Sequence, residues 1–178
     1  MTQFTPRKSS PRLPDFAYRG RYGYFVTIDT ADRQREFVGD FAETCAGKLL
    51  ESAARSSFEV MAYCMMPDHV HILLRGTTDE ADLVRCIKLF KQITGFAFKR
   101  RTGRQLWNRS FHDHVIRGEE DVDDIAAYIW HNPVRAGLVV SAADHPHSGP
   151  GDRLGALSDR PKGLSLRGDT LRWERRLR

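Results

Sequence analysis

The amino-acid sequence predicts an α+β fold in which helices pack against an antiparallel sheet. Segments rich in aromatic and β-branched residues alternate with segments of helical apolar spacing, in the order β-α-β-β-α-β-α. Only Pro67 and Asp68 separate the second strand from the third, which is typical of a hairpin. The order and the hairpin together indicate a ferredoxin-like arrangement, with a four-stranded antiparallel sheet, two helices on one of its faces and a further C-terminal helix.

The first half of the chain is expected to supply three strands and one helix. Aromatic and β-branched residues predict a strand over 22–30, and apolar residues at helical spacing predict a helix over 38–54. The second and third strands are expected at 58–66 and 69–75, on either side of the proline turn. These segments make the β-α-β-β part of the predicted order.

The second half is expected to supply two helices and the fourth strand. A capping residue and an early acidic turn predict a long helix over 79–102, which ends at Gly103. Residues 105–117 have the composition of a strand. An acidic first turn suits the dipole of a helix over 119–132, and Pro133 should end it because the residue before a proline avoids helical backbone angles.

The composition changes at both ends of the chain and divides it into three parts. Residues 1–14 contain basic residues and prolines but no acid, and we expect a flexible basic arm. Residues 15–145 hold all the predicted elements and form the compact domain. Residues 146–178 are rich in Gly, Pro, Ser and Arg and carry eight Lys or Arg against four acids, so we expect a mobile basic tail.

The overall composition narrows the class of protein. A chain of 178 residues with 40% hydrophobic residues predicts one domain with a real core. The formal net charge of +5 indicates a polyanionic partner, with nucleic acid first, or simply a soluble basic protein. The three cysteines lack a CxxC spacing and predict reduced thiols in the cytoplasm. No apolar run approaches the roughly 20 residues of a membrane helix, and the first residues do not resemble a signal peptide.

Two histidines stand at the start of the third predicted strand. Strand side chains alternate between faces, so His69 and His71 point to one side and Val70 to the other. Two imidazoles about 7 Å apart at Cα can converge on one divalent ion, or they can be ordinary hydrogen-bonded histidines. A second pair, His112 and His114, lies on the fourth predicted strand and could be the true site, a decoy or a helper.

Tyr128 and Asn132 form the next candidate pair. They are four residues apart in the helix predicted over 119–132, so they lie on one helical face and could approach the same point. By spacing alone, a core tyrosine followed by a capping asparagine is the commoner explanation.

The helix predicted over 79–102 carries many basic residues and could contact phosphate groups, although a solvated basic face is the alternative. Trp107, just beyond it, could stack on unpaired bases or lie in the core. The predicted DNA-binding surface consists of Arg85, Lys88, Lys91, Lys99, Arg100, Arg101, Arg104 and Trp107.

Four segments, taken together, resemble a REP-associated tyrosine transposase, a branch of the single-tyrosine HUH transposases. They are YFVTIDT, YCMMPDHVHILL, LWNRSFHDHVIR and AAYIWHNPVRAGLV, in the order of the family, and the likeness extends from about residue 13 to residue 140. The chain departs from the family after the last motif. An aromatic–serine segment is often found there, and this chain has HPHSGPGD, which leaves the docking of the C-terminal segment open.

The resemblance implies a role for each candidate residue. His69 and His71 would be ligands of a divalent ion, Mg²⁺ or Mn²⁺, and Asn132 a further ligand where related insertion-sequence transposases have glutamine. Tyr128 would be the nucleophile, which makes the C-terminal helix the catalytic one.

The resemblance also implies an activity. A monomer or homodimer in the cytoplasm would bind hairpin and single-stranded DNA, and would cleave and rejoin it through a 5′-phosphotyrosine intermediate. The alternatives are a non-catalytic protein that binds structured nucleic acid and a metal-dependent phosphodiesterase that uses water.

Overall fold

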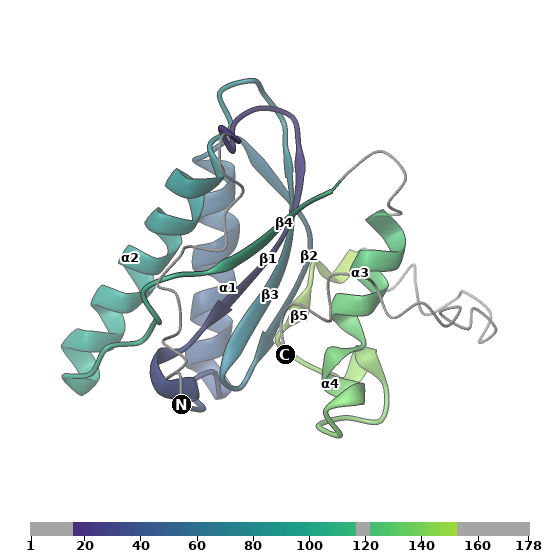
Figure 1. The fold of residues 1–178 in the computed structure, drawn as a ribbon. Helices are drawn as coiled ribbons and strands as arrows, with labels where there is room; N and C mark the ends of the chain where they lie inside the picture. Colours follow the sequence, from purple (N-terminus) through teal and green to yellow (C-terminus); the bar gives the residue numbers. More distant parts are fainter. Residues whose placement is uncertain (1–15, 117–121, 153–178) are drawn as a thin grey trace, which may run out of the picture.

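The centre of the computed structural model, which describes residues 16–116 and 122–152, is an antiparallel sheet of five strands in the order β4-β1-β3-β2-β5 (Figure 1). Four of them have the order expected of the predicted sheet, and the fifth adds two residues at one edge. The α+β, ferredoxin-like prediction is therefore confirmed, with one more strand than expected. The strands are β1 (Gly23–Asp29), β2 (Phe58–Met66), β3 (His69–Gly76), β4 (His112–Ile116) and β5 (Ser148–Gly149).

Helices cover both faces of this sheet. Helices α1 (Gly39–Ala54) and α2 (Leu83–Thr102) lie on one face, as predicted, and α3 (Val122–Trp130) and α4 (Asn132–Arg135) lie on the other (Figure 1). Short 3₁₀ turns at 31–33 and 142–144 complete the described elements. No described helix has the length and hydropathy to cross a membrane.

The alternation of side chains along β3 separates two hydrophobic clusters. Val70, Ile72 and Leu74 are buried in the cluster on the side of α1 and α2. Leu73 is buried in the cluster on the side of α3, together with Phe25 from β1. The predicted alternation is therefore confirmed, and it puts the histidine side of β3 under α3.

Two predicted boundaries move because of side-chain hydrogen bonds. Helix α2 begins four residues later than expected, since the Asp82 side chain caps it by accepting a hydrogen bond from the Arg85 amide at 2.9 Å. The strand expected over 105–117 forms only at His112–Ile116. The Lys91 ammonium group instead binds backbone carbonyls in the residues before β4, so they cross beneath α2 as a loop.

The helix expected over 119–132 is shorter and is followed by a second one. Helix α3 ends at Trp130, and α4 begins at Asn132 with Pro133 in its first turn. A proline fits there because the first amides of a helix have no intrahelical partner. Proline therefore lies in the first turn of a new helix instead of ending helical structure altogether.

The predicted boundary at residue 145 is too early. Ser148 and Gly149 pair with β2 as β5, and the Trp130 indole donates a hydrogen bond of 2.9 Å to the Gly149 carbonyl. Gly149 has to be glycine because a Cβ atom would lie 2.7 Å from the Tyr63 ring. Residues 146–152 thus belong to the fold. The predicted arm at 1–14 and the rest of the predicted tail lie outside the described residues.

Candidate active site

The two imidazoles of β3 face each other on the α3 side of the sheet. The Nε2 atoms of His69 and His71 are 3.1 Å apart. The Nδ1 atom of His69 lies 2.5 Å from a carboxylate oxygen of Asp68, and the Nδ1 atom of His71 lies 2.9 Å from the hydroxyl oxygen of Thr27. The outer nitrogen of each ring therefore has a partner on the sheet or its turn, and the inner nitrogens point at one location.

The environment of His71 keeps its imidazole neutral. The ring is buried, and burial is the main reason that the pKa of His71 falls well below its usual range. The neighbouring His69 and the guanidinium groups of Arg135 and Arg33 lower that pKa further. A neutral imidazole keeps a lone pair, so His71 can serve as a ligand or a hydrogen-bond acceptor.

Tyr128 projects from α3 onto the histidine side of the sheet. Its ring centroid lies 6.4 Å from that of His71 and 6.2 Å from that of Phe25. The side chain is partly buried, and its neighbours in α3, Ile125 and Ile129, are buried against the sheet. Helix α3 therefore brings a tyrosine to the histidine pair from a segment more than fifty residues away in the chain.

Asn132 lies beside Tyr128, where it caps the end of α3. Its Nδ2 group donates hydrogen bonds to the carbonyls of Tyr128 at 3.0 Å and Ile129 at 3.3 Å. Its Oδ1 atom accepts a hydrogen bond of 2.8 Å from Arg135. The one oxygen through which Asn132 could bind a cation is thus in contact with a guanidinium group.

Arg135, like Thr27, is a residue of this site that the sequence analysis missed. Its guanidinium carbon lies 3.8 Å from the centre of the Tyr128 ring, a cation–π contact. The signal was present in the spacing, since residues 128, 132 and 135 follow the i, i+4, i+7 pattern of one helical face.

The second histidine pair lies on the same face of the sheet, on the edge strand. His112 is the cross-strand partner of Thr27, and Thr27 is in turn the partner of His71. His114 pairs in the same way with Phe25. Directly opposite residues share a face, so both histidines border the site without joining the facing nitrogens.

No group of three or more His, Cys, Asp or Glu side chains in the described parts of the chain is arranged to hold a metal ion. A cation held by His69 and His71 would therefore need ligands of another kind. The resemblance implies that the Asn132 oxygen would be one such ligand.

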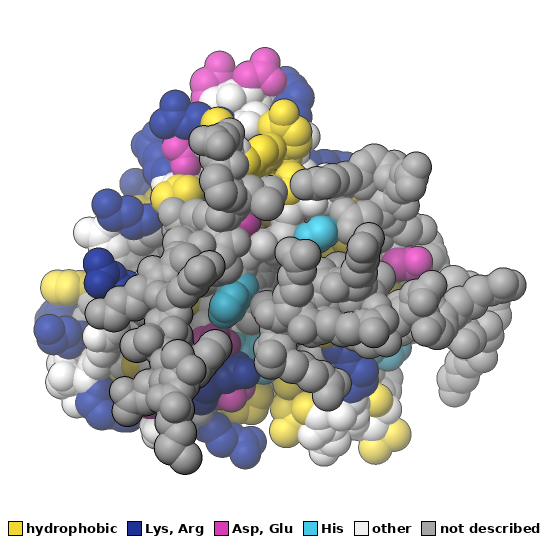
Figure 2. Space-filling model, in the orientation of Figure 1, with side chains coloured by type: hydrophobic (Ala, Val, Ile, Leu, Met, Phe, Trp, Pro, Cys, Tyr) yellow, Lys and Arg dark blue, Asp and Glu magenta, His cyan; other side chains and the backbone are white. Residues whose placement is uncertain are grey.

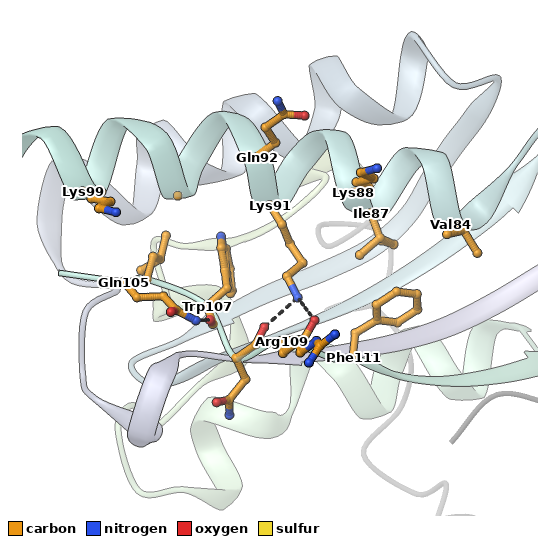
Figure 3. A pocket seen from close by; sticks show the side chains of 13 residues that line it. Val84, Ile87, Lys88, Lys91, Gln92, Lys99, Gln105, Trp107, Arg109 and Phe111 are labelled. Atoms are coloured by element: carbon orange, nitrogen blue, oxygen red, sulfur yellow. Dashed lines mark hydrogen bonds between the residues drawn. The ribbon is translucent and has the colours of Figure 1, made fainter. Parts of the chain in front are cut away.

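The predicted DNA-binding residues line a different part of the molecule. A groove of about 750 Å³ lies between α2 and residues 105–111 (Figure 3). It is lined by apolar side chains and by the basic residues Lys88, Lys91, Lys99 and Arg109, with no acidic residue. Lys and Arg side chains also follow the outer edge of the molecule along α2, on the left of Figure 2.

Two of the predicted DNA contacts have structural roles instead. The Lys91 ammonium group donates to the carbonyls of Asn108 at 2.7 Å and Arg109 at 3.0 Å, so it ties the loop to α2 (Figure 3). Trp107 is 4% exposed, and its indole donates to the Thr94 hydroxyl at 2.9 Å. The prediction that Trp107 stacks on bases is wrong because its ring is part of the core.

The other predicted contacts are exposed cations of two kinds. Arg104 pairs with Glu36 at 2.7 Å, whereas Arg101 lies over the Phe41 ring and Arg100 over the Phe96 ring. The remaining three are exposed on the surface of α2, and no salt bridge joins them to another described residue: Arg85, Lys88 and Lys99.

Comparisons of the sequence and of the structure with known proteins both find tyrosine transposases. A family model described as "Transposase IS200 like" matches residues 21–132. A Haemophilus influenzae protein assigned to the REP-associated tyrosine transposases is 30% identical over 136 residues, which cover 70% of this chain and 77% of that protein.

Two further relatives agree. The REP-associated tyrosine transposase of Escherichia coli K12 is 27% identical over 128 residues, which cover 70% of this chain and 74% of that protein. A solved structure of a REP-associated tyrosine transposase bound to a REP hairpin superposes with a TM-score of 0.63. It covers 83% of this chain and 82% of its own at 21% identity, so it supports the fold alone.

Proposed function

We propose that this chain, which belongs to the IS200-like transposase family and to its REP-associated tyrosine branch, is an endonuclease and strand transferase for single-stranded DNA. One observation carries the proposal. The ring of Tyr128 lies against His71, on the face of the sheet where the two Nε2 atoms approach to 3.1 Å. The proposed nucleophile therefore lies on the same face of the sheet as the proposed pair of ligands, which supports the proposal.

His69 and His71 fit a divalent ion. Two nitrogens 3.1 Å apart can both bind one ion at metal–nitrogen distances of about 2.1 Å. Histidine ligands normally donate their second N–H to a neighbouring oxygen, and Asp68 and Thr27 provide those oxygens. A bound ion would polarise the scissile phosphate and stabilise the charge that develops on it. Imidazole ligands favour Mn²⁺ over Mg²⁺ in a purified system, and Asn132 would supply a further oxygen.

Thr27 suits both states of such a site. In the absence of an ion, His71 can donate its Nε2–H to His69, and the Thr27 hydroxyl then donates to Nδ1 of His71. When Nε2 of His71 has to offer its lone pair to an ion, the ring proton is on Nδ1. The Thr27 hydroxyl oxygen then accepts a hydrogen bond from Nδ1–H. A hydroxyl group can do either without moving its oxygen.

Tyr128 would attack the phosphate through its phenolic oxygen. The new bond joins that oxygen to phosphorus, the bond from phosphorus to the 3′ oxygen breaks, and a free 3′-hydroxyl leaves. The 5′ end stays attached to the enzyme as a phosphotyrosine. The 3′-hydroxyl of another strand can then reverse the step, so cleavage and rejoining need no ATP.

The DNA partner is expected to be a hairpin with adjacent single-stranded DNA, as a relative of this chain has been solved with a REP hairpin. The groove beside α2 supports this, since its basic lining carries no acid. Lys88 and Lys99 are exposed in its lining, Arg85 is exposed elsewhere on α2, and all three can contact phosphates. We expect a cytoplasmic protein that acts as a monomer or a homodimer.

A single gel tests the function. Labelled single-stranded DNA from repeats that flank the gene is incubated with the protein and Mn²⁺ and is separated under denaturing conditions. We expect a labelled band that migrates with the protein and that disappears with EDTA or with Tyr128→Phe. Tyr22→Phe is the matched control, because Tyr22 is an exposed tyrosine outside the site.

The alternatives give different gels. Cleaved DNA without the covalent band, unaffected by Tyr128→Phe, would show that water is the nucleophile and that the protein is a phosphodiesterase. A shift on a native gel with neither product would leave a protein that only binds structured nucleic acid.

A further inference from the structure

Arg135 brings a positive charge to the candidate active site. Two guanidinium groups act on His71, those of Arg33 and Arg135. Arg33 donates to a carboxylate of Asp29 at 2.8 Å and lies 3.8 Å from one of Asp68. Arg135 has no carboxylate partner among the residues that the structure describes, and its contacts are the Tyr128 ring and the Asn132 oxygen.

The hydrogen bond to Asn132 uses only part of the binding capacity of the Arg135 guanidinium group. A guanidinium group stays charged at all physiological pH values and carries five N–H donors in a planar fork that matches two phosphate oxygens. Arg135 gives one of these donors to a neutral amide oxygen, and the residue is exposed. A hydrogen bond to an anion is roughly twice as strong as one to a neutral acceptor. A phosphate at this position would therefore bind Arg135 more strongly than the Asn132 oxygen does, and would compete for the donor that Asn132 holds.

We propose that Arg135 binds a phosphate of the single-stranded DNA beside Tyr128, and that its guanidinium group releases the Asn132 oxygen when it does so. The inference rests on the proposed function and adds a residue to it. It also makes the readiness of Asn132 depend on DNA.

Asn132 is held in place without Arg135. Its Nδ2 group donates to two carbonyls at the end of α3, those of Tyr128 and Ile129. Loss of the guanidinium contact frees one acceptor oxygen and leaves these two hydrogen bonds intact. The freed oxygen can then serve as the further ligand of an ion held by His69 and His71.

The two binding events should therefore be coupled. DNA that draws Arg135 away makes the third ligand available, so Mn²⁺ should bind more tightly in its presence. Coupling between two ligands is reciprocal and typically amounts to about 5- to 150-fold in affinity. Mn²⁺ should raise the affinity for DNA by the same factor.

The experiment measures Mn²⁺ binding to the full chain with and without a single-stranded oligonucleotide, by calorimetry. All proteins carry Tyr128→Phe, which prevents cleavage and keeps the ring under Arg135. The test variant is Arg135→Met, which keeps an aliphatic side chain over the ring and removes every donor. Arg55→Met is the control, since Arg55 is an exposed arginine just after α1, and Glu51 is its salt-bridge partner among the described residues.

In the parent and in the Arg55→Met control, we expect the oligonucleotide to increase Mn²⁺ affinity by at least fivefold. In Arg135→Met, we expect the Mn²⁺ affinity without DNA to equal or exceed that of the parent, the increase caused by DNA to vanish, and the affinity for DNA to fall at least fivefold. Equal thermal stabilities of the variants show that the fold is intact.

The outcomes separate this inference from the proposed function. Coupling or DNA affinity in Arg135→Met equal to that in the control would overturn the role of Arg135 and leave the metal site standing. Binding of Mn²⁺ no tighter to the parent than to a His71→Ala variant would overturn the metal site, and the proposed function with it.

Discussion

At the scale of single residues, one hydroxyl group holds the more buried imidazole of the candidate site. Among the described residues, the Thr27 hydroxyl is the hydrogen-bond partner of Nδ1 of His71, at 2.9 Å. Replacement by Val keeps the shape of the side chain and removes the hydroxyl. We expect Thr27→Val to lower Mn²⁺ affinity by about 10- to 100-fold, because outer partners of metal-binding histidines have effects of that size.

The check is a Mn²⁺ titration of the two proteins under identical conditions. Thr44→Val is the matched control, since the Thr44 hydroxyl donates only to a backbone carbonyl of its own helix, α1. Unchanged Mn²⁺ affinity in Thr27→Val would mean that the hydroxyl does not fix His71.

The three cysteines give a second prediction at this scale. Burial raises the pKa of the Cys45, Cys64 and Cys86 thiols to about 12. At pH 8 a thiol with that pKa is ionised in only about one molecule in ten thousand, and the thiolate is the reactive form. We expect none of the three to react with a thiol reagent until the protein is unfolded, when all three should react.

The same pKa values set the response to alkaline pH. Unfolded thiols ionise near pH 8.5, whereas the folded ones remain protonated up to about pH 12. Their contribution to stability is therefore complete below pH 8.5 and is lost as the pH rises toward 12. Urea midpoints measured at pH 7.5 and pH 10 should show a lower midpoint at pH 10. Equal midpoints at the two pH values, or a rapid reaction of one thiol with the reagent in the native protein, would mean that the pKa values of the thiols are not raised by burial.

At the scale of elements, α2 carries two lysines with different tasks. Lys91 binds the carbonyls of Asn108 and Arg109, and Lys88, one turn earlier, lines the same groove from an exposed position. Removal of Lys91 leaves those carbonyls without their cation. We expect Lys91→Met to lower the free energy of unfolding by about 1–3 kcal/mol.

Lys88→Met is the matched variant, and we expect it to affect DNA binding instead of stability. We expect unchanged stability and weaker binding of hairpin DNA, because an exposed lysine contributes little to folding and can contact a phosphate. Urea unfolding and a DNA titration of both variants check this. Equal destabilisation by the two changes would mean that Lys91 does not hold the loop.

The elements that the sequence predicted well are those whose signal lies in their own residues. The periodicity of α1, β2 and β3 located them to within one residue. The composition of residues 105–117 predicts a strand, but only His112–Ile116 forms one. Trp107 and Phe111 lie in the part that does not. In the folded chain these rings pack under α2, while the backbone follows the reach of Lys91. β5 is two residues long and exists because of contacts with Tyr63 and Trp130, which no local pattern reveals.

In the candidate site, too, the sequence predicted what depends on local patterns and missed what depends on how the elements pack. Strand alternation alone put His69 and His71 on one side, and the structure agrees. Helical spacing put Tyr128 and Asn132 on one face but could not tell that α3 lies on the histidine side of the sheet. Only the resemblance joined Tyr128 to the pair. Two further residues complete the geometry, Thr27 and Arg135. The spacing of Arg135 links it to Tyr128 and Asn132, whereas Thr27 lies on another element and has no such signal.

At the scale of the whole molecule, the chain has a formal net charge of +5, and the groove beside α2 is lined by basic residues with no acid. Binding should therefore release counterions and weaken linearly in a plot of log affinity against log salt concentration. For single-stranded DNA, each phosphate contact contributes about 0.7 to the slope. We expect the double change Lys88→Met and Lys99→Met to reduce the slope by roughly 1.4.

Titrations at four salt concentrations check this prediction. Lys48→Met is the control, because Lys48 lies on α1 and pairs with Glu51 at 2.7 Å, away from the groove. A slope in the double variant equal to that of the control would move the DNA contact away from α2.

The sheet also separates two hydrophobic clusters, one under α1 and α2 and one under α3. The groove belongs to the first cluster and Tyr128 to the second. Substitutions that share no partner have additive effects on stability, so changes on one side should not depend on changes on the other. Mutations that accumulate in a lineage could therefore change the residues of the groove, and with them the nucleic acid that is recognised, without affecting the residues around Tyr128. The residues around Tyr128 could likewise change without affecting the groove.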